Sequence, residues 1–93
     1  MMIRMVTKYD VFVELYDRAK PCGIMEIVQN LKQPRRDYEK IRKILEVLEK
    51  MQLVQKSAPG YQVVMNFPNH RLFEALKYCL NNNVDYNSLF DKS

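Results

Sequence analysis

Basic side chains are concentrated in the middle of the chain, in a pattern suited to binding phosphate groups. Residues 32–56 contain eight basic and four acidic residues, so this stretch carries the whole formal net charge of +4. The flanking stretches 1–31 and 57–93 are each neutral. A localised positive excess is what a phosphate-facing surface requires. The basic residues are Lys32, Arg35, Arg36, Lys40, Arg42, Lys43, Lys50 and Lys56.

Other chemistry has few residues to support it. The chain has one histidine, His70, and two cysteines, Cys22 and Cys79. These are too few for a disulfide scaffold or a zinc site, and no nucleophile–base pair is visible. We therefore expect no metal, no cofactor and no catalytic residue. We expect His70 to be exposed, and the cysteines to be small buried thiols rather than a redox pair.

Length and composition predict one soluble domain over residues 1–93. The chain has 93 residues, of which 47% are hydrophobic, enough for one packed core. No stretch approaches 18 uninterrupted apolar residues, so we expect no membrane partner. The first residues lack the apolar core and cleavage site of a secretory signal, and we expect a reduced, cytoplasmic protein.

Three helices are predicted in the first half of the chain. Apolar residues at helical spacing predict helices over about 8–20, 24–31 and 34–51. Thr7 and Asp10 resemble a capping pair at the start of the first helix. In the third helix one half is apolar, through Tyr38, Ile41, Ile44, Leu45, Val47, Leu48 and Met51, and the other half is charged. Tyr38 is either a residue that faces DNA or, as we prefer, a core residue.

A hairpin and a fourth helix are predicted in the second half. Residues 53–56 and 61–65 are typical of strands, and 57–60 of a turn in which Gly60 adopts a positive φ. Asn69 is expected to cap a helix over about 70–80. Val84, Tyr86, Leu89 and Phe90 make the following tail apolar. The predicted class is therefore mainly α with a small β-hairpin.

This order of elements resembles the winged helix-turn-helix family over residues 8–66, with 67–93 as an additional C-terminal helix and apolar tail. The residues that carry the resemblance are Gly23–Leu31 for the second helix and Ile41–Val54 for the third helix and the strand after it. In this family the third helix usually enters the major groove of DNA, and the hairpin, or wing, often touches the backbone.

The resemblance implies a set of DNA-binding residues. On the third helix these are Arg35, Arg36, Glu39, Lys40 and Lys43, and on the wing they are Lys56, Ser57 and Gln62. An arginine at the helix start has donors suited to guanine O6 and N7. Helical spacing also aligns Arg36, Lys43 and Lys50 as a phosphate track, with Lys40 near its edge.

Two features depart from a strong DNA-binding surface. The wing turn contains no arginine or lysine. Glu39 is also spaced to pair with Lys43, and Glu46 with Lys50, which would neutralise part of the helix.

The fourth helix and the tail have three possible partners. The apolar residues either pack against the first helix, which we rank first, or form a dimer, or contact a following domain. The predicted dimer residues are Leu72, Phe73, Leu76, Leu80, Leu89 and Phe90.

The expected function is sequence-specific binding of double-stranded DNA by a small transcriptional regulator that is not an enzyme. The alternatives are a winged helix that binds another protein and an accessory N-terminal domain of a larger enzyme.

Overall fold

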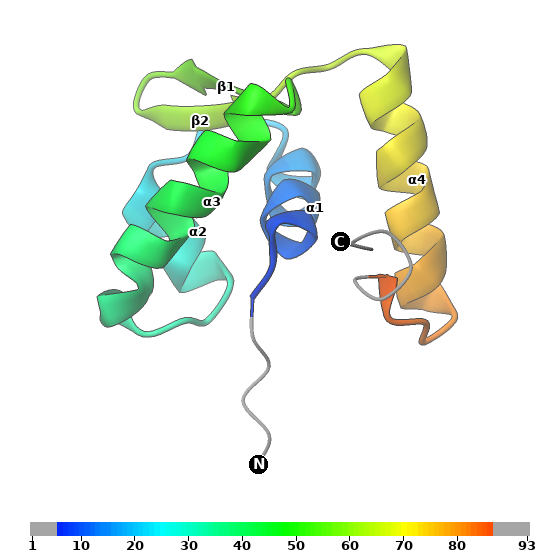
Figure 1. Ribbon diagram of the computed structural model, residues 1–93, viewed down its shortest axis with the longest axis horizontal. Coiled ribbons are helices and arrows are strands. Elements are labelled where there is room, and N and C mark those ends of the chain that lie inside the picture. Colours follow the sequence, from blue (N-terminus) through cyan, green and yellow to red (C-terminus); the bar gives the residue numbers. More distant parts are fainter. Residues whose placement is uncertain (1–5, 87–93) are drawn as a thin grey trace.

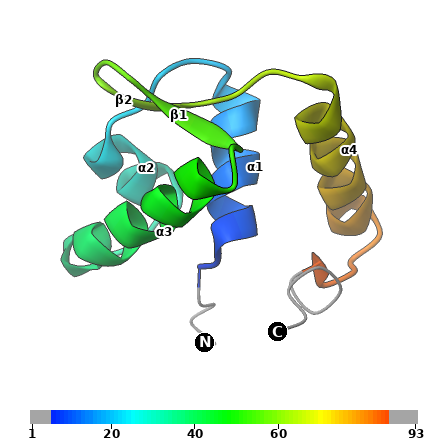
Figure 2. The ribbon, with the colours of Figure 1, turned by 45° about the horizontal axis from the view of Figure 1, so that its top comes forward.

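The computed structural model describes residues 6–86, and it is mainly helical with one small antiparallel sheet, as predicted. Its elements are α1 (Lys8–Arg18), α2 (Ile24–Asn30), the 3₁₀ turn η1 (Arg35–Asp37), α3 (Tyr38–Lys50), β1 (Val54–Ser57), β2 (Gly60–Val63) and α4 (Phe67–Asn81). In Figures 1 and 2, α2 and α3 lie on one side of α1 and α4 lies on the other. No helix within residues 6–86 is long and apolar enough to cross a membrane.

The core forms where α1, α2 and α3 meet. Phe12 and Leu15 of α1 are buried with Ile27 and Val28 of α2. From α3, the side chains of Ile41, Leu45 and Leu48 are fully buried in the same cluster. Complete burial of each such side chain contributes about 1.5–3 kcal/mol, so these residues fix the position of α3.

Hydrogen bonds between residues three or four positions apart define both ends of α1. The predicted capping pair is confirmed, because the backbone N–H of Thr7 donates to Oδ2 of Asp10 at 2.9 Å. The helix ends at Arg18, two residues earlier than predicted. Ala19 adopts a left-handed conformation with φ of 55°, and its N–H donates to the carbonyl of Leu15 at 3.1 Å. This geometry closes the helix without a glycine.

The start of α3 differs from the prediction. Arg35–Asp37 form a 3₁₀ turn, and the α-helix itself begins at Tyr38. Tyr38 is also 40% exposed, so its predicted place in the core is wrong. The apolar half of this helix is wider than the surface that packs, which leaves Val47 and Met51 exposed as well.

The hairpin is anchored to the α1–α2 connection by a bridge that the sequence did not predict. Cys22 and Tyr61 exchange two backbone hydrogen bonds of 2.8 Å each. Gly60 lies beside this bridge, and a Cβ on it would be 2.0 Å from the carbonyl oxygen of Cys22. Its φ is not positive. The predicted role of Gly60 is therefore wrong, because the residue permits a close backbone approach rather than a special turn conformation.

The cap of α4 also differs from the prediction. The helix begins at Phe67, and Oδ1 of Asn66 accepts from the backbone N–H of Asn69 at 2.9 Å. The predicted cap, Asn69, is instead buried. Its Nδ2 donates to the carbonyl of Val64 at 2.8 Å and to that of Gln52 at 3.2 Å. Asn69 therefore ties α4 to the hairpin and to the end of α3.

The inner face of α4 packs against its own chain, which is the arrangement ranked first above. Tyr16 of α1 stacks on Phe73 at 3.9 Å between ring centroids, and its hydroxyl lies 2.7 Å from Nδ1 of His70. Leu76 is fully buried. After the helix, Tyr86 donates a hydrogen bond to Asp10. The predicted dimer residues Leu89 and Phe90 lie outside the described residues.

Ala19→Gly is expected to raise the free energy of unfolding by about 0.5–1 kcal/mol, because glycine adopts the left-handed conformation without steric cost. The matched control is Ala75→Gly within α4, which is expected to lower the free energy of unfolding by about 1 kcal/mol. Urea denaturation followed by circular dichroism measures both values. A loss of stability in Ala19→Gly as large as that in the control would contradict the assigned helix end.

Candidate nucleic-acid interface

The candidate interface is centred on the side of α3 that faces away from the core. Arg36, Lys43 and Lys50 are all exposed, as the helical spacing predicted. Lys40 is half-buried at the edge of this row, and Arg35 is exposed in η1 beside Arg36. Lys43 and Lys50 are separated by about two helical turns along α3. Arg35 and Arg36 precede them in η1, and together these side chains form the basic row.

The glutamates of α3 are held by Arg42 rather than by lysines. Nε and Nη2 of Arg42 donate to Oε2 of Glu39 at 3.0 and 2.8 Å, and Nη1 donates to Oε1 of Glu46 at 2.8 Å. The predicted pairs of Glu39 with Lys43 and of Glu46 with Lys50 are therefore wrong. A guanidinium has five N–H donors in a planar fork, so one arginine can satisfy carboxylates three residues before it and four residues after it.

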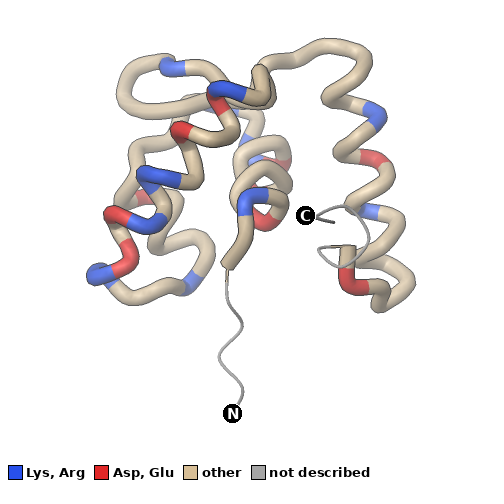
Figure 3. Tube along the Cα trace, in the orientation of Figure 1, with Lys and Arg blue, Asp and Glu red and all other residues tan. Residues whose placement is uncertain are grey.

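This pairing separates the charged residues of η1 and α3 into a paired cluster and an unpaired set. Glu39, Arg42 and Glu46 form one ion-paired cluster with a net formal charge of −1. Beside this cluster, Arg36, Lys43 and Lys50 form no ion pair with any residue between 6 and 86. Acidic and basic positions are interspersed along α3 in Figure 3, and the pairing leaves Lys43 and Lys50 as cations without an acidic partner among residues 6–86.

The side-chain hydrogen bond from Arg42 lowers the pKa of Glu39, and the charge of Lys43 adds a smaller effect in the same direction. The carboxylate therefore stays ionised to a lower pH than an ordinary glutamate. Glu39 was also predicted to contact DNA, but its carboxylate is already engaged within α3.

The hairpin adds one charged residue near the end of α3. Lys56 of β1 is exposed, and it lines a hollow between α3, the hairpin and the start of α2. The charged residues of α3 in this hollow are Arg42, Glu46, Glu49 and Lys50. The structure thus brings Lys56 close to one end of the basic row. Ser57 is half-buried where β1 ends, and Gln62 is half-buried on β2.

An apolar hollow of about 660 Å³ lies beside the row, between α3 and the start of α1. Val6, Ile44 and Val47 supply its apolar lining. Lys8, Lys40 and Lys43 also line it, so the hollow has a basic rim. Lys8 was missed by the sequence analysis, because the region 1–31 is neutral as a whole and the fold alone brings this residue beside α3.

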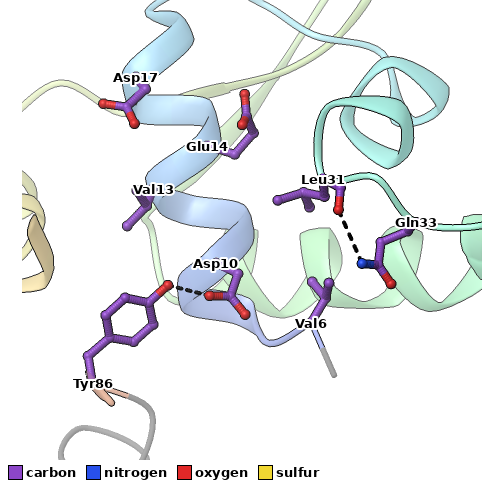
Figure 4. Close-up of a pocket in the computed structure, with 8 residues that line it drawn as sticks. All are labelled: Val6, Asp10, Val13, Glu14, Asp17, Leu31, Gln33 and Tyr86. Atoms are coloured by element: carbon purple, nitrogen blue, oxygen red, sulfur yellow. Dashed lines mark hydrogen bonds between the residues drawn. The ribbon is translucent and has the colours of Figure 1, made fainter. Parts of the chain in front are cut away.

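A second hollow, of about 290 Å³, is lined by acidic rather than basic residues and lies on another side of α1. Figure 4 shows Asp10, Glu14 and Asp17 at this site, together with Leu31 and Gln33 from the connection that precedes α3. Each carboxylate has a partner: Asp10 accepts from Thr7 and Tyr86, Glu14 pairs with Arg18, and Asp17 pairs with Lys77. Among the described residues, no group of histidines, cysteines and carboxylates could hold a metal ion.

Both cysteines lie in the core as free thiols, as predicted. Burial raises the pKa of the Cys22 thiol, which disfavours the reactive thiolate. Cys22 therefore belongs to the anchor of the hairpin and not to a reactive site.

Arg42→Gln is expected to raise the pKa of Glu39, because it removes the strongest interaction with the charged form. The folded-state pKa is lowered, so the stabilising effect of this carboxylate is present above the ordinary glutamate pKa and is lost as the pH falls through the lowered value. NMR titration of the Glu39 carboxyl carbon measures the shift. Lys43→Gln is the control, and a larger change in this variant than in Arg42→Gln would show that Lys43 is the main partner.

The chain was compared with protein families, with curated proteins and with solved structures, and none of the comparisons found a match. The ligand of the interface is therefore inferred from the residues themselves. These are a row of cations on η1 and α3, a nearby lysine on the hairpin, and a hollow with an apolar lining and a basic rim.

Proposed function

We propose that this domain is a winged helix-turn-helix that binds double-stranded DNA and acts as a small transcriptional regulator. The arrangement of the elements supports the fold assignment. Helices α2 and α3 are joined by a short connection and followed by the antiparallel hairpin, which serves as the wing. The Cys22–Tyr61 bridge holds this wing against the α1–α2 connection, so that α3 and the wing have a fixed relative position.

The observation that carries the proposal is the row of Arg36 in η1 with Lys43 and Lys50 in α3, none of which has an acidic partner among residues 6–86. A helix with its side chains is about 10–12 Å across, close to the width of the major groove of B-DNA. Lys43 and Lys50 are separated by about 10 Å along the helix axis. The two lysines so placed would contact phosphates while the helix lies in the groove.

The residues take different roles in this proposal. Arg35 and Arg36, at the start of the helix, are placed to contact base edges, and guanine is the base that best fits a guanidinium. Lys40, Lys43 and Lys50 contact phosphates, and Lys56 contacts the backbone from the wing. Glu39 and Glu46 keep Arg42 away from the DNA, because their charge-assisted hydrogen bonds already satisfy its donors.

Lys43→Ala and Lys50→Ala are each expected to weaken binding to random duplex DNA and to reduce the slope of log K against log salt concentration by about 0.9. Fluorescence anisotropy between about 50 and 200 mM salt measures both quantities. The matched control is Lys77→Ala on α4, which removes one charge away from the row and is expected to leave the slope unchanged. Slopes in Lys43→Ala and Lys50→Ala equal to that of the wild type would remove α3 as the docking face.

A second candidate function is the binding of an acidic protein partner, and the hollow beside α3 favours it. Val6, Ile44 and Val47 offer an apolar lining, and three lysines surround it. An amphipathic helix with acidic and aliphatic residues would match both features. Absence of DNA binding at about 50 mM salt would favour this candidate over the first.

A further inference from the structure

The outward face of α4 carries a stripe of exposed residues that its own domain does not cover. Phe67 is 70% exposed and Tyr78 is 69% exposed, which is unusual for aromatic side chains. Arg71 and Glu74 lie between them and are exposed as well. These four residues are at positions i, i+4, i+7 and i+11, so they follow one line along the helix. We call them the α4 stripe.

The α4 stripe lies opposite the face that packs on the core. At 100° per residue, all four members fall within about 60° of one another. Leu76, which is fully buried, lies on the other side of the helix. The contacts described for the stripe stay within α4. The guanidinium of Arg71 lies 5.7 Å from the centroid of the Phe67 ring, and Oε2 of Glu74 lies 3.6 Å from Nε2 of His70.

The order of residues in the stripe is self-complementary. Reading along α4 gives aromatic, arginine, glutamate, aromatic. If a second copy of the helix lies antiparallel across a two-fold axis, Phe67 faces Tyr78 of the second copy and Arg71 faces Glu74 of the second copy. The same two contacts then occur twice, as an interface between identical patches requires.

We propose that the α4 stripe is the interface through which two copies of this chain associate. The two Arg71–Glu74 pairs lie at the centre, and the aromatic pairs lie on either side and shield them from water. Met65 and Val84, just beyond the ends of α4, are exposed as well. A parallel arrangement would place like charges opposite each other, so the charges also select the antiparallel one.

This interface differs from the dimer surface predicted from the sequence. That prediction used the inner face of α4, but Leu76 is fully buried and Phe73 stacks on Tyr16 of the same chain. Of the predicted residues on α4, Leu80 keeps the most accessible side chain, at 38% exposed. The outer face is free because packing on α1 occupies only one side of the helix.

The size of the stripe indicates a weak dimer. A stable interface buries roughly 800 Å² per partner, and one face of a 15-residue helix, about 22 Å long, offers less than this. We expect a dissociation constant on the order of 100 µM, so association depends on protein concentration. The proposal does not rest on DNA binding, because the contacts need no DNA.

The experiment is sedimentation equilibrium of the full chain without DNA, from about 5 to 500 µM protein. The wild type is expected to shift from monomer to dimer over this range. Arg71→Glu alone and Glu74→Arg alone each place like charges opposite each other in both pairs. Each variant is expected to raise the dissociation constant at least about tenfold. Both positions are exposed, so both variants are expected to fold, which circular dichroism checks.

Two further combinations of the same substitutions distinguish a contact across the interface from a local effect on α4. An equimolar mixture of Arg71→Glu and Glu74→Arg restores opposite charges in a mixed dimer, and it is expected to associate within about threefold of the wild type. The double variant Arg71→Glu with Glu74→Arg is expected to recover association as a homodimer. The control is Lys50→Glu on α3, which matches the net charge of Arg71→Glu and is expected to leave the dissociation constant unchanged.

The opposite results would overturn the proposal. A wild type that stays monomeric at about 500 µM has no such interface. Single reversals that associate as the wild type does would show that another surface mediates the dimer. Single reversals that fail while both the mixture and the double variant also fail would show that residues 71 and 74 do not face each other.

Discussion

Burial of one face of α3 is the interaction on which the rest of this structure depends. Ile41, Leu45 and Leu48 enter the core that α1 and α2 form, and their complete burial fixes the rotation of α3 about its own axis. Once that rotation is fixed, the set of α3 residues that face solvent is fixed as well. Lys43 and Lys50 face outward because Ile41, Leu45 and Leu48 of the same helix face inward. The candidate interface is therefore a geometric consequence of core packing.

The same constraint explains why the sequence predicted the elements well. Apolar spacing in the helices and alternation in the hairpin record burial, and burial decides where each element lies. Details that depend on contacts between distant segments were not predictable in this way. The Cys22–Tyr61 bridge, the close approach at Gly60 and the hydrogen bonds of Asn69 all join parts of the chain that no local pattern connects. Asn66 and Asn69 are equally good caps by residue type, and tertiary structure selects between them.

The charged residues of α3 show a different limit of sequence reasoning. Spacing at i and i+4 identified which partners are possible, but Glu39, Lys43, Arg42 and Glu46 allow several pairings. Arg42 takes both glutamates because a guanidinium can donate to two carboxylates at once, whereas an ammonium is a single point of charge. The exposed row was predicted from periodicity alone. The structure was needed to show that the residues of this row form no ion pair with other residues between 6 and 86.

The contact between Asp10 and Tyr86 has a consequence for how the chain folds. It joins residues 76 positions apart, whereas α2 packs on α3 and β1 pairs with β2 over short separations. Closing a longer loop costs more chain entropy, so local contacts form early and this one late. Helix α4 is thus placed to dock onto a preformed body of α1, α2, α3 and the hairpin. It would also be the first unit to detach in a partial unfolding event, which would leave that body intact.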